Sequence, residues 1–265
     1  MPEGDTLFRA AAGLRPHLVG RPVTGARARR PGPQIERVVG STVTAVESQG
    51  KNLLIRFSNG LELRTHLRMN GSWHRYRPGE RWRRAEARAR VVLEVPGAVA
   101  VCFDAPVAEL FESRAEGLHP SLSKLGPDLL DPAFGEEHVA EAIRRLRDSG
   151  RAAMSISEAL LDQRALAGIG NIWRNETLFA ERVDPFVTVA NLDDATLERL
   201  VRRAHELLRG SAAMPPGRGP MRIYGRAGRP CLRCGTLVRS GPTSGELPRT
   251  TYWCPRCQRN EEEKR

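Results

Sequence analysis

Two stretches, Cys231-Leu232-Arg233-Cys234 and Cys254-Pro255-Arg256-Cys257, decide the fold of the C-terminal part of the chain. Two residues separate the cysteines of each pair, and nineteen residues separate the pairs. This spacing is typical of a tetrahedral zinc site, with the intervening residues folded as a two-stranded ribbon. Two disulfides are the alternative, and the lack of a secretion signal argues against them. We therefore predict one structural zinc ion, with Cys231, Cys234, Cys254 and Cys257 as its ligands.

The chain is strongly basic. Its 265 residues carry a formal net charge of +11, and the sequence pI is about 10.4. Such a charge implies a polyanionic partner, of which nucleic acid is the commonest. An acidic membrane surface is the alternative, but we find no basic amphipathic helix with a bulky apolar face. The basic charge is densest around the predicted ribbon, where nine Arg accompany one acid, Glu246, between Arg218 and Arg259.

No apolar segment of the sequence is long enough to cross a bilayer, and the first twenty residues do not resemble a secretion signal. We therefore expect a cytoplasmic, monomeric protein with no membrane partner. The fifth cysteine, Cys102, lies in an apolar stretch and is expected in the core.

The chain is long enough for two or three compact domains. We predict an α+β multidomain fold, with an N-terminal helix and antiparallel β-sandwich, a helical domain, and a C-terminal zinc β-ribbon. The expected boundaries are residues 1–115 for the sandwich domain, 116–132 for a linker rich in Gly and Pro, 133–217 for the helical domain, and 218–265 for the ribbon.

The spacing of apolar residues predicts the individual elements. A first helix contains Leu7 and ends at Gly20. Alternation and turn residues then predict six short strands, at Thr42–Ser48, Leu53–Phe57, Leu61–His66, Ser72–Tyr76, Arg90–Val95 and Ala98–Phe103. Later helices are predicted at Glu136–Asp148, Ile156–Leu161, Ile172–Arg182 and Asp193–Arg209, with Gly210 ending the last one.

The N-terminal residues Met1-Pro2-Glu3-Gly4-Asp5 place an unusual nucleophile beside a carboxylate. Removal of Met1 would leave a secondary amine on Pro2. Attack of that amine on the anomeric carbon of a sugar gives a cationic iminium, which acidifies the neighbouring sugar carbon. Glu3 could protonate the ring oxygen as a general acid. The alternative is an ordinary helix start, where Pro and acidic residues are common.

Four further residues are candidates for contacts with a phosphate backbone or a base. Lys51 follows Gly50 at the start of a strand, in a chain with only three Lys, so its ammonium is informative. Met69 lies in a turn and could fill the space of an extruded base, or merely pack. Asn171 follows a Gly-rich turn, as a phosphate ligand or a helix cap. Arg249 precedes a ribbon strand, where it could bind phosphate or be only solvated.

Together these motifs resemble the formamidopyrimidine-DNA glycosylase and endonuclease VIII family of base-excision repair enzymes. The resemblance covers the whole chain, and the order of the motifs carries it. The matching stretches are Pro2-Glu3-Gly4, Gly50-Lys51-Asn52-Leu53-Leu54, His66-Leu67-Arg68-Met69-Asn70-Gly71, Leu125-Gly126-Pro127-Asp128, Leu166-Ala167-Gly168-Ile169-Gly170-Asn171, and Tyr224 through Cys257.

The resemblance implies that Pro2 is a Schiff-base nucleophile and Glu3 an acid. It also implies that Lys51, Asn171 and Arg249 bind phosphates around a lesion, and that residues 166–171 form a helix-two-turns-helix joint. The implied activity is bifunctional: a DNA glycosylase excises the damaged base, and an abasic-site lyase then cleaves the strand by elimination. The implied partner is damaged double-stranded DNA, with single-stranded or bubble DNA left open.

Three departures from the family pattern bear on specificity. Many members have a glutamate where Asp5-Thr6 stands here, so Asp5 is only a candidate third acid. The purine-excising branch has a loop with Arg and Phe where this chain has residues 103–110, which contain neither Arg nor a second Phe. Residues 210–221 are also short for the loop that encloses an oxidised purine. We therefore predict the endonuclease VIII branch and oxidised pyrimidines. A purine-excising enzyme and a non-catalytic damaged-DNA-binding protein are the alternatives.

Overall fold

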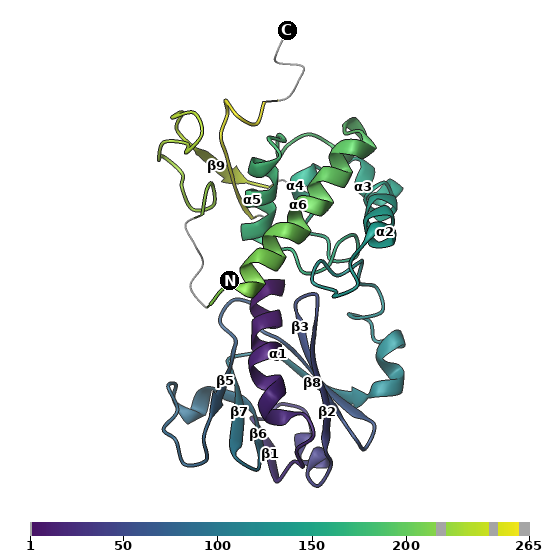
Figure 1. Ribbon diagram of the computed structural model, residues 1–265, viewed down its shortest axis with the longest axis vertical. Coiled ribbons are helices and arrows are strands. Elements are labelled where there is room, and N and C mark those ends of the chain that lie inside the picture. The colour runs from purple at the N-terminus through teal and green to yellow at the C-terminus, as the bar shows by residue number, and fades with distance from the viewer. Residues whose placement is uncertain (1, 216–220, 244–248, 260–265) are drawn as a thin grey trace. The chain divides into compact units, whose positions relative to one another are not determined.

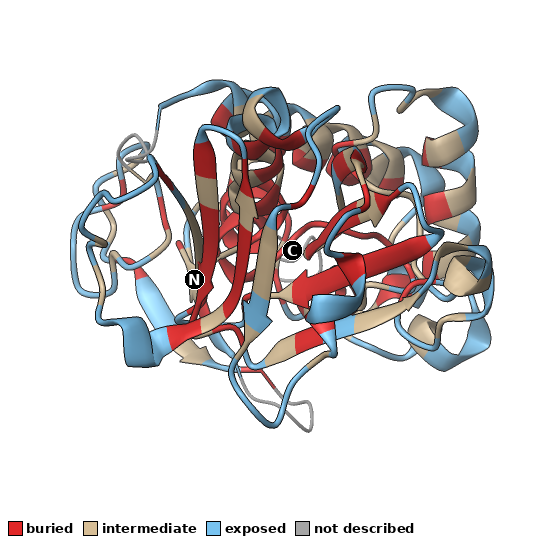
Figure 2. Ribbon diagram, turned by 90° about the horizontal axis from the view of Figure 1, so that it is seen from below, coloured by how far each residue is buried: buried red, intermediate tan, exposed pale blue. Residues whose placement is uncertain are grey.

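The computed structural model describes residues 2–215, 221–243 and 249–259. The chain forms two compact units, Met1–Lys124 and Leu125–Arg265 (Figure 1). Buried residues concentrate on the strands and helices, and exposed residues on the connecting loops (Figure 2). The finer division into four segments stays a prediction. Within the described ranges, no helix is both long and apolar enough to cross a membrane.

The first unit consists of one long helix and two antiparallel four-stranded sheets. Helix α1 spans Gly4–Leu18. The first sheet has the order β1-β6-β7-β5 and the second the order β2-β3-β4-β8. The strand bounds are β1 Gly25–Ala28, β2 Val43–Gln49, β3 Asn52–Phe57, β4 Leu61–His66, β5 Ser72–Tyr76, β6 Ala89–Val95, β7 Ala98–Phe103 and β8 Val107–Glu112, with short 3₁₀ turns η1 Ile35–Val38, η2 Glu86–Arg88 and η3 Ser113–Leu118.

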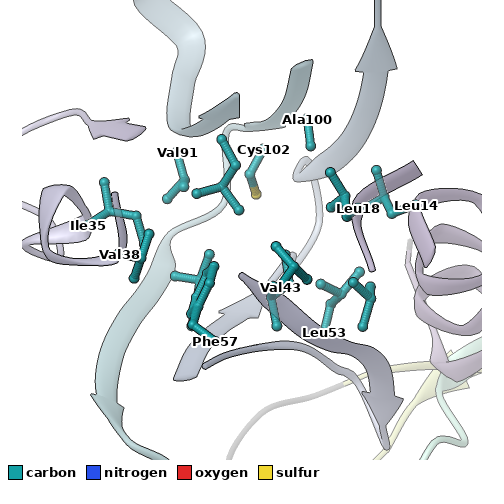
Figure 3. Packing of buried hydrophobic residues seen from close by; sticks show 14 of the residues in the cluster. Leu14, Leu18, Ile35, Val38, Val43, Leu53, Phe57, Val91, Ala100 and Cys102 are labelled. Carbon is teal, nitrogen blue, oxygen red and sulfur yellow. The ribbon is translucent and has the colours of Figure 1, made fainter. Parts of the chain in front are cut away.

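The core of this unit lies between the two sheets and α1 (Figure 3). Leu14 and Leu18 of α1, Leu53 of β3 and Cys102 of β7 belong to one apolar cluster and are almost completely buried. The predicted core position of Cys102 is therefore confirmed, and so is the sandwich. Because side chains alternate along a strand, Leu53 faces this core while its neighbour Asn52 faces the opposite side of the sheet.

Most predicted strands coincide with observed ones, but β1 and β8 were missed. Both are edge strands. Their residues are mostly half-exposed, and β1 has the sequence Gly-Ala-Arg-Ala, without a large apolar side chain. An edge strand is paired on one side only, so its sequence need not show strong apolar alternation.

The second unit is helical, with a small C-terminal ribbon. Its elements are α2 Glu136–Leu146, α3 Ser149–Ala152, α4 Ile156–Ala159, α5 Asn171–Ala180, η4 Val189–Asn191, α6 Asp194–Ala213, β9 Arg239–Pro242 and β10 Thr250–Trp253. Strands β9 and β10 pair antiparallel, which confirms the predicted two-stranded ribbon. Helix α5 packs against both α6 and β10.

The predicted end of the last helix at Gly210 is wrong, because α6 continues to Ala213. Buried Leu208 and Ser211 hold the helix on both sides of the glycine. A Cβ on Gly210 would meet no atom within 4 Å, so the position is open. A glycine there costs the helix only about 1 kcal/mol relative to alanine, which packing of the neighbouring turns offsets.

Part of the predicted linker is hydrogen-bonded to the turn that precedes α5. Gly126 N donates to Gln163 O at 2.9 Å, and Ala167 N donates to Pro127 O at 2.9 Å. A Cβ on Gly126 would lie 2.5 Å from the carbonyl oxygen of Ala165, so only glycine allows this approach. Residues 125–131 thus belong structurally to the second unit.

The core of the first unit predicts a large difference between two leucine truncations. Leu53 is fully buried, and Leu118 is 84% exposed. Leu53→Ala should lower the free energy of unfolding by about 2–5 kcal/mol, because it removes buried methyl groups and leaves a cavity. Leu118→Ala should change it by about 0.5 kcal/mol or less. Urea unfolding of both variants measures this, and equal midpoints would contradict the assigned core.

Candidate functional site

Helix α1 runs antiparallel to β2, which places the N-terminal residues. At the C-terminal end of α1, Gly20 N donates to Val43 O at 2.9 Å, at the start of β2. One turn earlier, Arg15 Nε donates to Val46 O at 3.0 Å. The helix and the strand have similar lengths, about 22 Å each. The start of α1 therefore lies at the same end of the unit as the turn after β2, where Lys51 is.

The start of α1 buries an acid beside Pro2. Glu3 is the N-cap residue and is fully buried, whereas Pro2 is partly exposed. The backbone carbonyl of Glu3 accepts hydrogen bonds from Thr6 N and Leu7 N, but its side chain makes no capping hydrogen bond. A capping role therefore does not explain why this carboxyl group is buried at the positive end of the helix.

Asp5 has a clear partner within the helix. Its side chain is fully buried, and Oδ2 accepts a hydrogen bond from Arg9 Nη2 at 3.1 Å, one turn further along. This ion pair gives Asp5 a role in holding the first turn of α1. Its part as a third acid stays a prediction.

Lys51 occupies a two-residue turn between paired strands. Gln49 and Asn52 pair directly across the turn, and Gly50 has φ of 57°. Glycine adopts positive φ readily, as a tight hairpin turn requires. Strand β3 also pairs with β4, and there Asn52 lies opposite His66. The end of β4 is therefore beside the same turn.

The end of the sheet near Lys51 is electropositive. Burial lowers the pKa of His66 to about 4, and the positive charges of Arg64, Arg68 and Lys51 add to the effect. His66 is therefore neutral near pH 7, and its Nδ1 accepts a hydrogen bond from Arg68 N at 3.1 Å. A site with several cations and a neutral imidazole favours an anion such as a phosphate.

Met69 projects from a braced turn that follows β4. The residue is 57% exposed. Gly71 N donates to Leu67 O at 2.9 Å, and a Cβ on Gly71 would lie 2.6 Å from that same oxygen. The sequence did not predict Arg84, whose Nη1 donates to Asn70 O at 3.1 Å and to Asp104 Oδ2 at 2.6 Å. An exposed Met on a fixed turn can act as a wedge.

Asn171 is not the cap of α5, so the cap interpretation is wrong. The N-cap residue is Gly170, which has no side chain to donate or accept. Asn171 instead begins the helix, is 7% exposed, and its Nδ2 donates to Thr250 O at 3.1 Å. That carbonyl belongs to the residue after Arg249, so the structure brings Asn171 and Arg249 together.

Arg249 directly precedes β10, at the end of the ribbon where Thr250 pairs with Pro242. It is exposed, and its backbone N donates to Thr243 Oγ1 at 3.0 Å while its carbonyl accepts from Thr243 N at 3.0 Å. Arg174, which sequence reasoning missed, is fully buried and links the two elements. Its Nη2 donates to Asn171 Oδ1 at 2.6 Å and to Thr250 O at 3.2 Å. Its position three residues after Asn171, on one helix face, is the only sequence signal for this contact.

The four cysteines of the ribbon converge. Their sulfur atoms all lie within 4.8 Å of one another, with 4.0 Å between Cys231 and Cys257 and 3.5 Å between Cys234 and Cys254. A tetrahedral zinc ion with Zn–S bonds of about 2.3 Å separates its sulfurs by about 3.8 Å. The cluster fits a four-thiolate metal site, and no disulfide joins these cysteines.

Two family models match the chain. Residues 1–106 match the formamidopyrimidine-DNA glycosylase N-terminal domain, and residues 125–218 match the formamidopyrimidine-DNA glycosylase H2TH domain. The second range contains the turn and helix that carry Asn171. The predicted helix-two-turns-helix domain is therefore confirmed.

Curated relatives match over almost their full length. The chain is 40% identical to a probable endonuclease 8 2 of Streptomyces coelicolor, covering 97% of this chain and 94% of the relative. It is 36% identical to the DNA-(apurinic or apyrimidinic site) lyase Nei2 of Mycolicibacterium smegmatis, covering 97% and 99%.

A solved structure supports the same fold. The formamidopyrimidine DNA glycosylase of Lactococcus lactis, non-covalently bound to DNA with an abasic site, superposes with a TM-score of 0.81. The match covers 97% of this chain and all of that one, at 22% identity, so it shows the fold alone. The two family models and the curated relatives go further: this chain belongs to the formamidopyrimidine-DNA glycosylase and endonuclease VIII family.

Proposed function

We propose that this protein is a bifunctional DNA glycosylase and abasic-site lyase of base-excision repair. The observation that carries the proposal is the start of α1, where partly exposed Pro2 adjoins the buried carboxyl group of Glu3, at the end of the unit that also holds Lys51. The relatives named as endonuclease 8 and as an abasic-site lyase support it.

The proposed reaction begins with the amine of Pro2. This amine is free only after removal of Met1, which lies outside the described ranges. The amine attacks C1′ of the damaged nucleotide, the C1′–N bond to the base breaks, and the base leaves with a proton. Protonation of O4′ by Glu3 opens the sugar ring and leaves an iminium between Pro2 and C1′. The iminium acidifies C2′, a C2′ proton passes to water, and the electron pair left behind forms a C2′–C3′ double bond as the C3′–O bond to the 3′ phosphate breaks. Water then releases Pro2.

Lys51, Asn171, Arg249 and Met69 would hold the DNA around the reacting nucleotide. Lys51, beside neutral His66, would bind a phosphate of the lesion strand. Asn171 at the positive end of α5 and exposed Arg249 would bind another, and Met69 would occupy the space of the extruded base. Phosphate contacts of this kind position the strand, whereas the pocket around the base selects the lesion.

We propose oxidised pyrimidines as the main lesions. Asp104, in the segment where the purine-excising branch has its Arg and Phe, is held here by ion pairs with Arg84 and Arg88. Residues 210–221 are short for a loop that encloses an oxidised purine, which also favours pyrimidines. Of these, residues 216–220 lie outside the described ranges. The relatives named endonuclease 8 support the endonuclease VIII branch, on which this choice rests. Because those relatives are bacterial enzymes of DNA, we place this protein in the bacterial cytosol.

We propose zinc as the ion of the cysteine cluster. Four thiolates at tetrahedral spacing suit Zn²⁺, whose role in such a site is structural. Bound there, the ion would hold the ribbon that carries Arg249.

Reduction with borohydride tests the nucleophile. On abasic-site DNA, the protein with Pro2 as its first residue should form a covalent adduct. A version that keeps one additional residue before Pro2 has no amine on Pro2 and should form none, while it still binds the DNA. Gel analysis of trapped complexes and mass spectrometry of the N-terminus measure this. If the unblocked protein forms no adduct, the non-catalytic alternative is correct.

Lesion preference is tested by excision of thymine glycol and 8-oxoguanine from otherwise identical duplexes. We expect thymine glycol to be released at least tenfold faster, since nothing corresponding to the Arg and Phe of the purine branch stands in residues 103–110. Single-turnover rates measure the preference. A faster release of 8-oxoguanine would assign the protein to the purine-excising alternative.

Zinc content tests the metal site. The purified protein should contain one zinc ion per chain, and Cys257→Ala should lose it together with most DNA affinity, because the ribbon unfolds without its metal. Cys102→Ala is the matched control, since Cys102 lies in the sandwich core and should leave the zinc content unchanged. Elemental analysis and a DNA-binding titration measure both. Full activity without bound zinc would refute the assignment.

A further inference from the structure

Polar side chains are buried on the outer face of the sheet β2-β3-β4-β8, behind the turn that carries Lys51. Asn52 of β3 is 4% exposed and Arg64 of β4 is 6% exposed. Neither belongs to the apolar cluster between the sheets. A buried guanidinium needs partners that offset its desolvation, so the contacts of this pair are informative.

Asn52 closes the turn with its side chain. Its Nδ2 donates to Gln49 O at 3.1 Å, on the other side of the Gly50–Lys51 turn. Its Oδ1 accepts from Arg64 Nε at 2.9 Å. Both ends of one amide therefore join the backbone that flanks Lys51 to the interior of the sheet.

Arg64 continues the connection to the edge of the sheet. Its Nη1 donates to Glu109 Oε2 of β8 at 2.5 Å, and His119 Nε2 lies 3.2 Å from the same oxygen. The chain of contacts thus runs from Gln49 through three strands to the segment after η3. Apolar side chains of similar volume often stabilise a buried position as well as an ion pair does, so stability alone does not explain this network.

Lys51 is the kind of residue that needs such support. An ammonium on a four-carbon stem has many orientations, and it makes no rigid two-point contact of the kind that Arg makes with phosphate. A displacement of about 1 Å at a reacting group can reduce a rate about a hundredfold. The backbone of the turn must therefore be fixed before the side chain can be placed.

We propose that Asn52 and Arg64 are positioning residues for the reaction. Through the hydrogen bond to Gln49 O they hold the Gly50–Lys51 turn, and so direct Lys51 at the DNA. The proposal rests on the proposed function, in which Lys51 binds a phosphate beside the reacting sugar.

A second ion cluster on the same face supplies a matched control. Arg56 of β3 pairs with Glu47 at 2.7 Å, Glu62 at 3.1 Å and Glu116 at 2.9 Å. Arg56 is four residues from Asn52, which is about 13 Å along the strand. Arg56→Met removes a comparable network from the sheet without touching the turn.

The kinetic test compares Asn52→Asp, Arg64→Met and Arg56→Met. Asn52→Asp keeps an acceptor for Arg64 but replaces the donor to Gln49 O with an oxygen. At saturating abasic DNA, Asn52→Asp and Arg64→Met should lower the single-turnover rate of elimination at least tenfold, and Arg56→Met less than twofold. In a protein that already carries Lys51→Ala, Asn52→Asp should lower the rate of elimination by less than a further twofold. The effects of residues that act through one group are not additive.

A spectroscopic test is independent of activity. The chain has three Lys, at 51, 124 and 264, so selective ¹⁵N-lysine labelling gives three backbone amide signals. Asn52→Asp and Arg64→Met should shift or broaden the Lys51 signal and leave that of Lys124 in place. Arg56→Met should leave the Lys51 signal unchanged. Assignment by Lys51→Arg identifies the signal.

The outcomes separate the two proposals. If Lys51→Ala slows elimination but Asn52→Asp and Arg64→Met slow it no more than Arg56→Met, the positioning network is overturned and the role of Lys51 stands. An unmoved Lys51 amide signal in both variants also overturns the network. If Lys51→Ala itself reacts at the unmodified rate, the proposed role of Lys51 fails, and the network fails with it.

Discussion

The antiparallel packing of α1 on β2 is the constraint on which the N-terminal site depends. A chain end is normally the least ordered part of a domain, because few contacts hold it. Here the hydrogen bonds from Gly20 N to Val43 O and from Arg15 Nε to Val46 O fix the helix along the strand. Apolar residues of α1 in the core then hold its first turn. Because the helix is rigid over about 22 Å, fixing it along the strand also fixes the position of Pro2 at its start.

At the end of the first unit that holds Lys51, the net charge depends on the burial of His66 as well as on the number of basic residues. A protonated His66 would add to the repulsion among Arg64, Arg68 and Lys51, and burial removes that proton at neutral pH. Arg64 is balanced by Glu109 of β8, and Arg68 and Lys51 suit the phosphate ligand of the proposed function. Asp5, by contrast, has its charge balanced within the helix by Arg9. The charged groups at this end thus include ion pairs that stabilise the fold and, under the proposed function, a lysine that binds a phosphate.

The sequence predicted what depends on local pattern. Three strands, β4, β5 and β7, have the predicted bounds, and the cysteine spacing predicted the cluster, since each depends on neighbouring residues. Arg64, Arg84 and Arg174 could not be predicted. They are basic residues in a chain full of Arg, and most of their hydrogen-bond partners are distant in the sequence, although Arg174 also bonds to Asn171 three residues away. The N-cap residue of α5 is Gly170 and not Asn171. The side chain of Asn171 instead bonds to Thr250 in another element, and a contact between separate elements leaves no local sequence pattern.

The same arrangement of side chains occurs in both units. Arg64 donates to Asn52 Oδ1, and Asn52 Nδ2 donates to a backbone carbonyl beside Lys51. Arg174 donates to Asn171 Oδ1, and Asn171 Nδ2 donates to the carbonyl beside Arg249. In both, a buried guanidinium fixes an amide, and the amide fixes the backbone next to a cation. An amide suits this position because it accepts from the guanidinium and donates to the carbonyl at once, which neither a carboxylate nor an ammonium can do. Under the proposed function, backbone order of this kind would lower the entropy cost of binding a phosphate, because the backbone beside the cation is already fixed before the DNA binds.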